Sequence, residues 1–430
     1  MTWGLGGLVG LLRRPASGAV AGQVTQALAG LVLQVAAARF LGAAGLATFA
    51  LIYGLIVLVT AVASGMVGDS LTVLDRHDRP VRAGLHVWAV LVAVVAGLVG
   101  GGLAAVTGVL PAWAAGVLGL AVVAFVLEDT LRRLLMATGR FWSLPAVDLT
   151  SLVVALATLV GYAVAGPLTL PHFFVALLAG QTAAGLVAWW RVPLDERARG
   201  PWRGADLAAV WAFGVWRAAA QTIRPGLLSG LRFVVVGLAG AAAYGPIEAA
   251  RVYTAPTLTI VAGLGSYLLP HYVTMSRDST GPRPVSRALR SADRVALAMA
   301  GSVALISLAA VALQPVVEPL LTGGGYDMPV LAVAGWGAYA VAAAVLLPYS
   351  GVATVQRQQR RVLAVRLLEF VALGVVVLLV RSVAEGEQWA PLTLAVGPLL
   401  AAVAVRQLVL RPLADREDGA HRTGRAPAPV

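Results

Sequence analysis

The sequence predicts an all-α polytopic membrane protein with twelve transmembrane helices in two six-helix lobes. Three observations lead to this fold class: a very apolar composition, a succession of helix-length apolar segments, and a weak internal repeat. Of the 430 residues, 59 % are hydrophobic and only 12 % are charged. A soluble chain of this length needs far more polar surface, whereas lipid-facing helices require such a composition.

Twelve apolar segments are each long enough to cross a bilayer, since a helix needs about 20 residues to do so. They fall near residues 19–38, 46–68, 84–106, 113–135, 146–166, 172–190, 208–237, 246–273, 292–313, 329–352, 362–383 and 390–410. Residues 1–18 place Arg13 and Arg14 after a short apolar run, which reverses the order of a signal peptide. We therefore expect residues 1–18 to be an uncleaved cytoplasmic segment. At the other end of the chain, we expect residues 411–430 to be a disordered cytoplasmic tail.

The arginines predict the orientation of these helices. Every basic residue is Arg, and nearly all of those outside the apolar segments lie in alternate connections, with only Arg39 and Arg381 on the opposite side. Because cytoplasmic loops carry the excess of basic residues, both termini are expected in the cytoplasm. The absence of Lys beside abundant Ala, Gly and Val indicates GC-rich coding, hence a bacterial chain in the cytoplasmic (inner) membrane. The net charge of +12 is thus a topology signal, and we expect no nucleic-acid partner.

An internal repeat connects the two halves of the chain. Residues 41–74 weakly match residues 239–272, with Gly65 aligned to Gly263. An even number of helices precedes the second copy, so both halves should have the same orientation. They would be related by a pseudo-two-fold axis along the membrane normal.

This repeat sets the expected domain boundaries. The N-terminal lobe should span residues 19–190 and the C-terminal lobe residues 208–410, joined by an Arg- and Pro-rich cytoplasmic linker at 191–207. The same alignment places polar residues of the first helix over polar residues of the seventh: Gln23 over Gln221, Gln26 over Arg224, and Gln34 over Arg232.

Three arginines lie at membrane depth in the seventh apolar segment. Arg217, Gln221, Arg224 and Arg232 share one face of a helix, and the arginines span roughly 22 Å of it. No acidic residue lies three or four positions from any of the three. Two interpretations are open: the arginines pair with acids on neighbouring helices, or they line a wet cavity for an anion. A guanidinium suits a phosphate or pyrophosphate because its planar fork donates paired hydrogen bonds.

Pro225 and Gly226 directly follow the central arginine, Arg224. Proline removes a helix hydrogen bond and clashes with the preceding turn, so a kink is expected there. Pro225 and Gly226 are therefore the candidate hinge of a moving helix.

Other charges in the apolar segments have partners at helical spacing. The expected pairs are Glu128 or Asp129 with Arg132 or Arg133, Glu248 with Arg251, and Glu369 with Arg366. Glu248 and Arg251 could also face a cavity. Asp148 has no partner on its own helix, so it is either an ion-coupling carboxylate or an interfacial group.

Several chemistries are excluded by residue content. The chain has no Cys and only 5 His, so neither a thiolate nucleophile nor a metal cluster is expected. A phosphate-binding Gly-rich loop with Lys and Ser or Thr is missing, which excludes direct ATP hydrolysis. The connections on the predicted external side are short. We therefore expect a protein without catalytic residues, metal or cofactor.

Two segments resemble bacterial polysaccharide (O-antigen type) flippases. "AARFLGAAGLATFALI" (37–52) resembles the Arg-x-Leu-Gly segment near the start of these proteins. "PVVEPLLTGGGYDMPVLAVAGWGAY" (315–339) is similar to the segment between their ninth and tenth helices. The family belongs to the multidrug/oligosaccharidyl-lipid/polysaccharide (MOP) exporter superfamily, whose members have a MATE-like fold.

The resemblance implies a function. It implies an alternating-access transporter that moves a polyprenyl-pyrophosphate-linked oligosaccharide across the cytoplasmic membrane for cell-surface polysaccharide biosynthesis. The implied partners are the lipid-linked glycan, membrane lipids and enzymes of cell-envelope biosynthesis.

The resemblance also implies site residues, because family members hold the pyrophosphate with cations in the cavity between their lobes. Arg217, Arg224 and Arg232 fit this role by position, and Arg39 matches the family's arginine near the outer end of the first helix. Gln26, Gln34 and Gln221 would complete the cavity. The sequence departs from the family in having Gln in place of basic residues along the inner part of the first helix.

Other functions remain open. A multidrug exporter of the same fold is the nearest alternative, although unpaired arginines would repel cationic drugs. A membrane glycosyltransferase, polymerase or ligase would use acidic residues at external helix ends, where this chain has Glu318, Asp327, Glu385 and Glu387. A scaffold that has lost transport is the third alternative.

Overall fold

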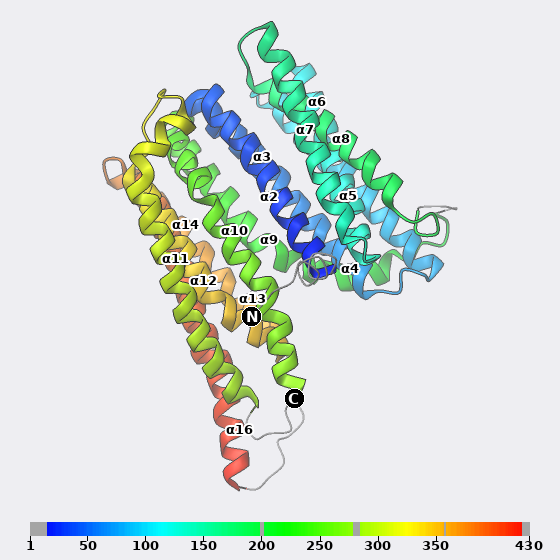
Figure 1. The fold of residues 1–430 in the computed structure, drawn as a ribbon, viewed down its shortest axis with the longest axis vertical. Coiled ribbons are helices and arrows are strands. Elements are labelled where there is room, and N and C mark those ends of the chain that lie inside the picture. Colours follow the sequence, from blue (N-terminus) through cyan, green and yellow to red (C-terminus); the bar gives the residue numbers. More distant parts are fainter. Residues whose placement is uncertain (1–14, 198–201, 278–283, 357, 424–430) are drawn as a thin grey trace, which may run out of the picture. The chain divides into compact units, whose positions relative to one another are not determined.

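The computed structural model describes residues 15–197, 202–277, 284–356 and 358–423. Every regular element within these ranges is a helix (Figure 1). Eleven of the helices are long and apolar enough to cross a membrane. The prediction of an all-α polytopic protein is confirmed, while the symmetry between two lobes stays a prediction. The predicted span 246–273 is helical as well, but its helix is not among those eleven.

The chain divides into two compact units. The first unit extends to Leu41 and continues from Thr48 to Ser229. Its helices are α2 (Pro15–Phe40), most of α3 (Gly42–Ala63), the π-helix η1 (Ser64–Gly68), α4 (Asp69–Val73), α5 (Arg79–Val106), α6 (Ala112–Ala137), the 3₁₀-helix η2 (Phe141–Ser143), α7 (Leu144–Ala165), α8 (Leu170–Arg191) and the first part of α9 (Leu207–Ala239).

The second unit comprises Gly42–Ala47 and the chain from Gly230 onward. Its helices are the last part of α9, α10 (Ala241–Arg277), α11 (Pro284–Thr322), α12 (Val330–Val355), α13 (Gln359–Leu367), the 3₁₀-helix η3 (Leu368–Phe370), α14 (Val371–Ser382), the 3₁₀-helix η4 (Gly386–Trp389), α15 (Ala390–Ala404), the π-helix η5 (Val405–Leu410) and α16 (Arg411–Thr423).

The boundary between the units lies inside α9, not in the 191–207 segment that we expected to be the linker. The described part of that segment packs on the first unit. Glu196 is buried and pairs with Arg76 at 3.1 Å, and the Asp206 amide donates to the Pro80 carbonyl at 3.0 Å. Its polar groups therefore have partners within the first unit.

Close packing between α5 and α6 depends on small residues. A Cβ atom on Gly97 would lie 2.6 Å from the Gly119 carbonyl oxygen, and one on Gly101 would lie 2.8 Å from that of Ala115. Small residues four positions apart let membrane helices approach each other closely, because association in lipid depends on van der Waals packing. The Ala- and Gly-rich composition thus has a structural use.

In the second unit, α12 is the central helix and contacts α10, α11 and α15. The Trp336 indole on α12 is buried and donates to the Ile247 carbonyl of α10 at 3.0 Å. The start of α3 joins this unit because Gly245 of α10 packs directly against the Ala43 backbone.

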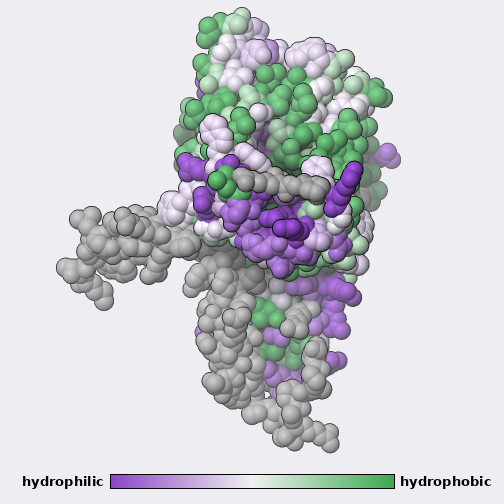
Figure 2. Space-filling view, turned by 90° about the vertical axis from the view of Figure 1, so that its right-hand side faces the viewer, coloured by the Kyte–Doolittle hydropathy of each residue, from purple (hydrophilic) through white to green (hydrophobic). Residues whose placement is uncertain are grey.

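Large apolar side chains cover the outer surfaces of the units. Leu98 and Val153 in the first unit are 71 % and 62 % exposed, and Leu297 in the second is 77 % exposed. Figure 2 looks onto the first unit, where hydrophobic side chains cover the upper part of the face and hydrophilic ones gather below them. Such a surface is stable only in contact with lipid.

The segment expected to be a disordered tail is helical over most of its length. Residues Arg411–Thr423 form α16, which packs against α11. The Glu417 carboxylate accepts hydrogen bonds from the backbone amides of Val285 at 3.0 Å and Ser286 at 3.1 Å. These amides at the start of α11 have no partner within their own helix, so each helix end stabilises the other.

Candidate functional site

The three arginines of the predicted face lie on one continuous helix. α9 remains helical from Leu207 to Ala239 with Pro225 inside it. Because the unit boundary falls at Ser229, Arg217 and Arg224 belong to the first unit and Arg232 belongs to the second. The hinge role of Pro225 and Gly226 stays a prediction.

Arg217 pairs with an acidic residue on another helix. Its Nη2 lies 2.7 Å from the Asp69 Oδ2 atom, and its Nε donates to the same oxygen at 2.8 Å. Gln221 reaches this oxygen at 3.4 Å. The Arg217 side chain remains 42 % exposed, so the pair is open to its surroundings. For Arg217, the structure favours the interpretation that it pairs with a neighbouring helix.

A π-helix brings Asp69 to Arg217. All five residues of η1 are buried, and a Cβ atom on Gly65 would lie 2.4 Å from the Ala218 backbone. A Cβ on Gly214 would lie 2.5 Å from the Met66 carbonyl oxygen. Two glycines thus allow η1 and α9 to touch through their backbones, and Asp69 begins the next helical turn. π-helices of a single turn occur frequently at functional sites.

Arg224 has no partner in the part of the chain that the structure describes. Its side chain is partly buried, and no described residue offers it a hydrogen bond or an ion pair. An arginine inside an apolar helix normally pairs with an acid, a carbonyl or water. Of the three arginines of the predicted face, Arg224 is therefore the one without an acidic partner among the described residues.

Arg232 is buried in a charge cluster of the second unit. Its Nη2 donates to the Glu248 Oε1 atom at 3.1 Å, Arg251 Nε donates to the same oxygen at 2.7 Å, and the Tyr244 hydroxyl donates to Oε2 at 2.8 Å. The predicted Glu248–Arg251 pair is confirmed. Two guanidinium groups face a single carboxylate, and the buried Nε of Arg232 has no hydrogen-bond partner. Among the described residues, two positive charges thus face one negative charge in this cluster.

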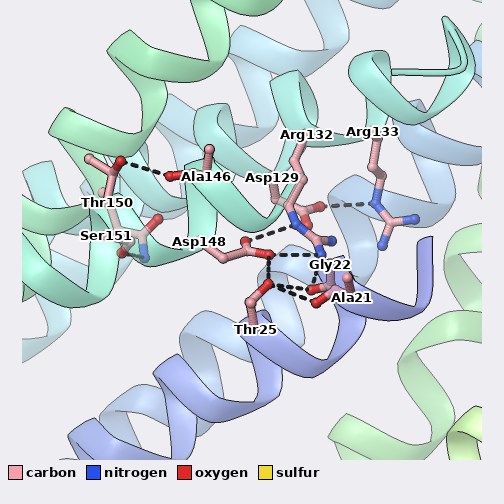
Figure 3. Close-up of polar contacts among 11 residues, drawn as sticks. Ala21, Gly22, Thr25, Asp129, Arg132, Arg133, Ala146, Asp148, Thr150 and Ser151 are labelled. Carbon is pink, nitrogen blue, oxygen red and sulfur yellow. Dashed lines mark hydrogen bonds and ion pairs between the residues drawn. The ribbon is translucent and has the colours of Figure 1, made fainter. Parts of the chain in front are cut away.

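A second buried cluster joins α2, α6 and α7 in the first unit (Figure 3). Arg132 on α6 donates from Nε to Asp148 Oδ1 at 3.0 Å and from Nη2 to the Gly22 carbonyl at 3.0 Å. The Thr25 hydroxyl donates to Asp148 Oδ2 at 3.0 Å. The side chains of Arg132 and Asp148 are 2 % and 5 % exposed. Asp148 is thus buried and paired with an arginine of another helix, and both of its predicted roles, ion coupling and an interfacial position, stay predictions.

The neighbouring residues Asp129 and Arg133 form the i,i+4 pair expected from their spacing, at 3.0 Å. The Ser64 hydroxyl also donates to Asp129 at 2.8 Å. Glu128 is 7 % exposed and has no hydrogen bond or ion pair with any described residue. The predicted pairing of Glu128 with Arg132 or Arg133 is therefore wrong, because Arg132 turns toward Asp148 and Arg133 toward Asp129.

The remaining predicted site residues lie on α2. Gln26 and Gln34 are partly buried, and Gln34 donates to the Gly30 carbonyl of its own helix at 3.0 Å. Gln23 and Arg39 are exposed. The positional match between these residues and the arginines of α9 stays a prediction from the repeat.

A cavity of about 410 Å³ opens in the second unit, and no arginine lines it. Asp327, Glu385 and Glu387 line it, beside the start of α10. Burial raises the pKa of the nearby Tyr326 phenol above its ordinary value, so this group stays neutral. Glu318 does not line the cavity but accepts a hydrogen bond from the Met328 amide at 2.8 Å. Among the described residues, no group of acidic and histidine side chains is arranged to bind a metal ion.

The contacts of Asp69 and Asp148 were not identified from the sequence. Both acids lie far from their arginines along the chain, and spacing identifies only partners on the same helix. Asp69 sits just beyond the second apolar segment, so a search for acids near the ends of other helices could have found it. For Asp148, the absence of a same-helix partner was the available signal.

No protein-family model and no curated protein sequence matches this chain. Solved structures do match over nearly its full length. An inward-facing multidrug resistance transporter of the MATE family, in the MOP superfamily, has 15 % identity and a TM-score of 0.64, covering 92 % of this chain and 96 % of that one. An outward-facing multidrug resistance transporter of the MATE family has 15 % identity and a TM-score of 0.59, covering 94 % of this chain and 95 % of that one.

A MOP superfamily transporter from Pyrococcus furiosus is similar to the same extent. It has 15 % identity and a TM-score of 0.62, covering 94 % of this chain and 95 % of that one. At this level of identity the likeness concerns the fold. The chain is therefore a multi-pass membrane protein with the fold of MATE transporters of the MOP superfamily.

Proposed function

We propose that the chain is a flippase that moves a polyprenyl-pyrophosphate-linked oligosaccharide, or a related anionic glycolipid, across the cytoplasmic membrane of a bacterium. The glycan would then pass to enzymes that build cell-surface polysaccharide. Transport proceeds by alternating access of the two halves to the two sides of the membrane, driven by an ion gradient or the membrane potential.

The observation that carries this proposal is that Arg224 has no hydrogen-bond or ion-pair partner among the described residues. A charged side chain inside a membrane helix costs about 3 kcal/mol even on translocon-insertion scales, so such a group is retained where it has a use. Arg217 has Asp69 as a partner, whereas Arg224 has none among the described residues. A pyrophosphate supplies the acceptors that Arg224 lacks.

The cluster around Glu248 supports an anionic substrate in the second unit. Arg232 and Arg251 together carry two positive charges against one negative charge on Glu248. Arg251 is the more exposed of the two, at 14 %, so the excess charge can act on a group at the cluster's edge. Such an excess attracts an anion and repels a cation.

The comparisons support a transporter without deciding its substrate. Two neighbours are described as multidrug resistance transporters of the MATE family, whereas the Pyrococcus furiosus neighbour is described as having a binding pocket of reverse polarity that suggests a different function. The fold thus accommodates more than one class of substrate. An ion-coupled multidrug exporter is accordingly the second candidate, and the two differ in the charge of the cargo.

Mass spectrometry of co-purified lipids tests the proposal. The protein would be extracted from its native membrane in mild detergent, and bound lipids compared with those of the Arg224→Ala variant. We expect a polyprenyl-pyrophosphate glycan on the wild type and at least tenfold less on the variant. An absence of such lipids from the wild type, together with binding of a cationic dye such as ethidium, would contradict the proposal and support the multidrug exporter.

A further inference from the structure

An apolar groove of about 380 Å³ runs along the second unit between α13–η3 and α15–η5. Most of its lining is aliphatic: Val365, Leu368, Gly397, Leu400, Ala401, Val403, Ala404 and Leu408, with Gln407 as the polar member. Leu368, Leu400 and Leu408 are between 63 % and 70 % exposed, so the groove opens outward. α13 contacts both α15 and η5, which brings its two walls together.

The groove has a glycine at its base. A Cβ atom on Gly397 would lie 3.2 Å from the Cα and Cβ atoms of Glu369, so glycine lets α15 pack closely against η3 at this point. Glu369 is buried and is neutralised by Arg366 at 2.9 Å, and it therefore adds no net charge to the groove. The floor is apolar in effect and suits a hydrocarbon chain.

Both walls of the groove end in an exposed arginine at the same end. Arg361 lies four residues before Val365 on α13, which places both residues on one face of that helix. Arg411 lies four residues after Gln407 and donates to its side chain at 3.2 Å. The two walls run in opposite directions along the chain, so the start of α13 and the start of α16 lie at the same end.

We propose that this groove binds an anionic phospholipid of the surrounding bilayer. One acyl chain lies along the aliphatic walls, and the phosphate is held by Arg361 and Arg411. The groove belongs to membrane-spanning helices, where lipid chains and not water fill surface hollows, and basic residues at the ends of such hollows bind acidic head groups. This site concerns a resident lipid and does not depend on the identity of the transported substrate.

The charges favour an acidic head group over a zwitterionic one. Arg366 is already paired with Glu369, whereas Arg361 and Arg411 are exposed and have no acidic partner among the described residues. Asp415 lies one turn after Arg411 on α16, on the side of Arg411 that is farther along the chain from the groove residues. Each basic residue near a membrane surface increases the affinity for acidic lipid about fivefold, which predicts roughly 30-fold for the two.

Native mass spectrometry tests this site on the purified full chain. Dioleoylphosphatidylglycerol, dioleoylphosphatidylcholine and inorganic phosphate would be added separately. The first has acyl chains and a net negative charge, the second has acyl chains and no net charge, and the third has negative charge and no acyl chain. We expect one tightly held phosphatidylglycerol per chain, weaker binding of phosphatidylcholine, and no retained phosphate. Equal binding of the two lipids, or competition by inorganic phosphate alone, would overturn the proposal.

Two variants separate the parts of the site. Arg361→Gln combined with Arg411→Gln should reduce phosphatidylglycerol affinity roughly 30-fold, and Ala404→Leu should weaken binding of both lipids by filling the groove. The matched controls are Arg290→Gln and Ala309→Leu, which change exposed residues of α11 outside the groove. Unchanged binding in both groove variants, with helix content and thermal unfolding like the wild type, would disprove the site.

Discussion

Arg132 and Asp148 show what a buried ion pair requires inside a membrane protein. The carboxylate accepts from the guanidinium and from the Thr25 hydroxyl, and the guanidinium also reaches the Gly22 carbonyl (Figure 3). Both charges are almost inaccessible to solvent. In this environment, removal of one partner leaves an uncompensated buried charge, which costs more than the pair itself contributes.

Asp148→Asn should therefore destabilise the protein strongly, because Arg132 would remain buried with a neutral partner. We expect a loss of about 3–5 kcal/mol in the free energy of unfolding, measured by denaturant titration in detergent. Arg406→Gln is the control, since Arg406 and its partner Asp293 are each 33 % exposed and loss of that pair should cost about 1 kcal/mol or less. Equal losses of unfolding free energy in the two variants would show that the burial of an ion pair does not determine its contribution to stability.

The pairs of Arg217 and Arg232 should differ in the same way. Glu248 is completely buried between two guanidinium groups, whereas Asp69 is 18 % exposed and its partner 42 %. Glu248→Gln should cost several kcal/mol of stability, and Asp69→Asn about 1 kcal/mol or less. Thermal unfolding followed by circular dichroism measures the difference, and a larger effect for Asp69→Asn would contradict our assignment of the buried cluster.

At the scale of secondary structure, the crossing of η1 and α9 depends on glycine. A methyl group at Gly65 would collide with the Ala218 backbone, which cannot move independently of its helix. Gly65→Ala should therefore separate the two helices and cost about 1–3 kcal/mol. It should also weaken the contact between Arg217 and Asp69.

Gly102→Ala provides the comparison for this crossing. Gly102 lies inside α5, and nothing lies within 4 Å of a Cβ atom placed there. Since alanine favours the helix, that substitution should stabilise the protein by up to about 1 kcal/mol. Denaturant unfolding of both variants measures these opposite signs, and destabilisation of similar size in both would show that the crossing is not tightly packed.

At the scale of the whole molecule, the helices were largely predictable and their contacts were not. Hydropathy identified the spans because each lipid-facing helix must satisfy its own backbone hydrogen bonds and carry apolar side chains, and both constraints act on every segment separately. Same-helix pairs such as Glu369 with Arg366 followed from spacing and are confirmed at 2.9 Å. The partners of Arg132 and Arg217 depend on which helices become neighbours, and one sequence does not contain that information in a local pattern.

Two further differences come from contacts between distant segments. Residues 411–430 were expected to be a disordered tail, yet Arg411–Thr423 form α16, and Glu417 joins this helix to the beginning of α11. The boundary between the units lies within α9 and not at the polar segment 191–207, since that segment packs on the first unit through Glu196 and Asp206. Composition alone does not distinguish a linker from a packed loop.

Membrane orientation is a prediction for the whole chain that labelling can measure directly. The natural sequence has no Cys, so Asp78→Cys and Gly166→Cys each introduce a single reactive thiol in a connection. Because cytoplasmic connections carry the arginines, an impermeant maleimide added to intact cells should label position 166 and spare position 78. The reverse pattern would invert the predicted topology.

The central claim is that Arg224 binds the anionic head group of a transported lipid. The most direct measurement is flipping of a polyprenyl-pyrophosphate oligosaccharide in proteoliposomes by wild type, Arg224→Ala, Arg224→Lys and the control Arg290→Ala. We predict that Arg224→Ala loses at least tenfold in rate, that Arg224→Lys retains part of the activity because it keeps the charge, and that Arg290→Ala is unchanged. Wild-type rates for a properly inserted Arg224→Ala protein would contradict the claim.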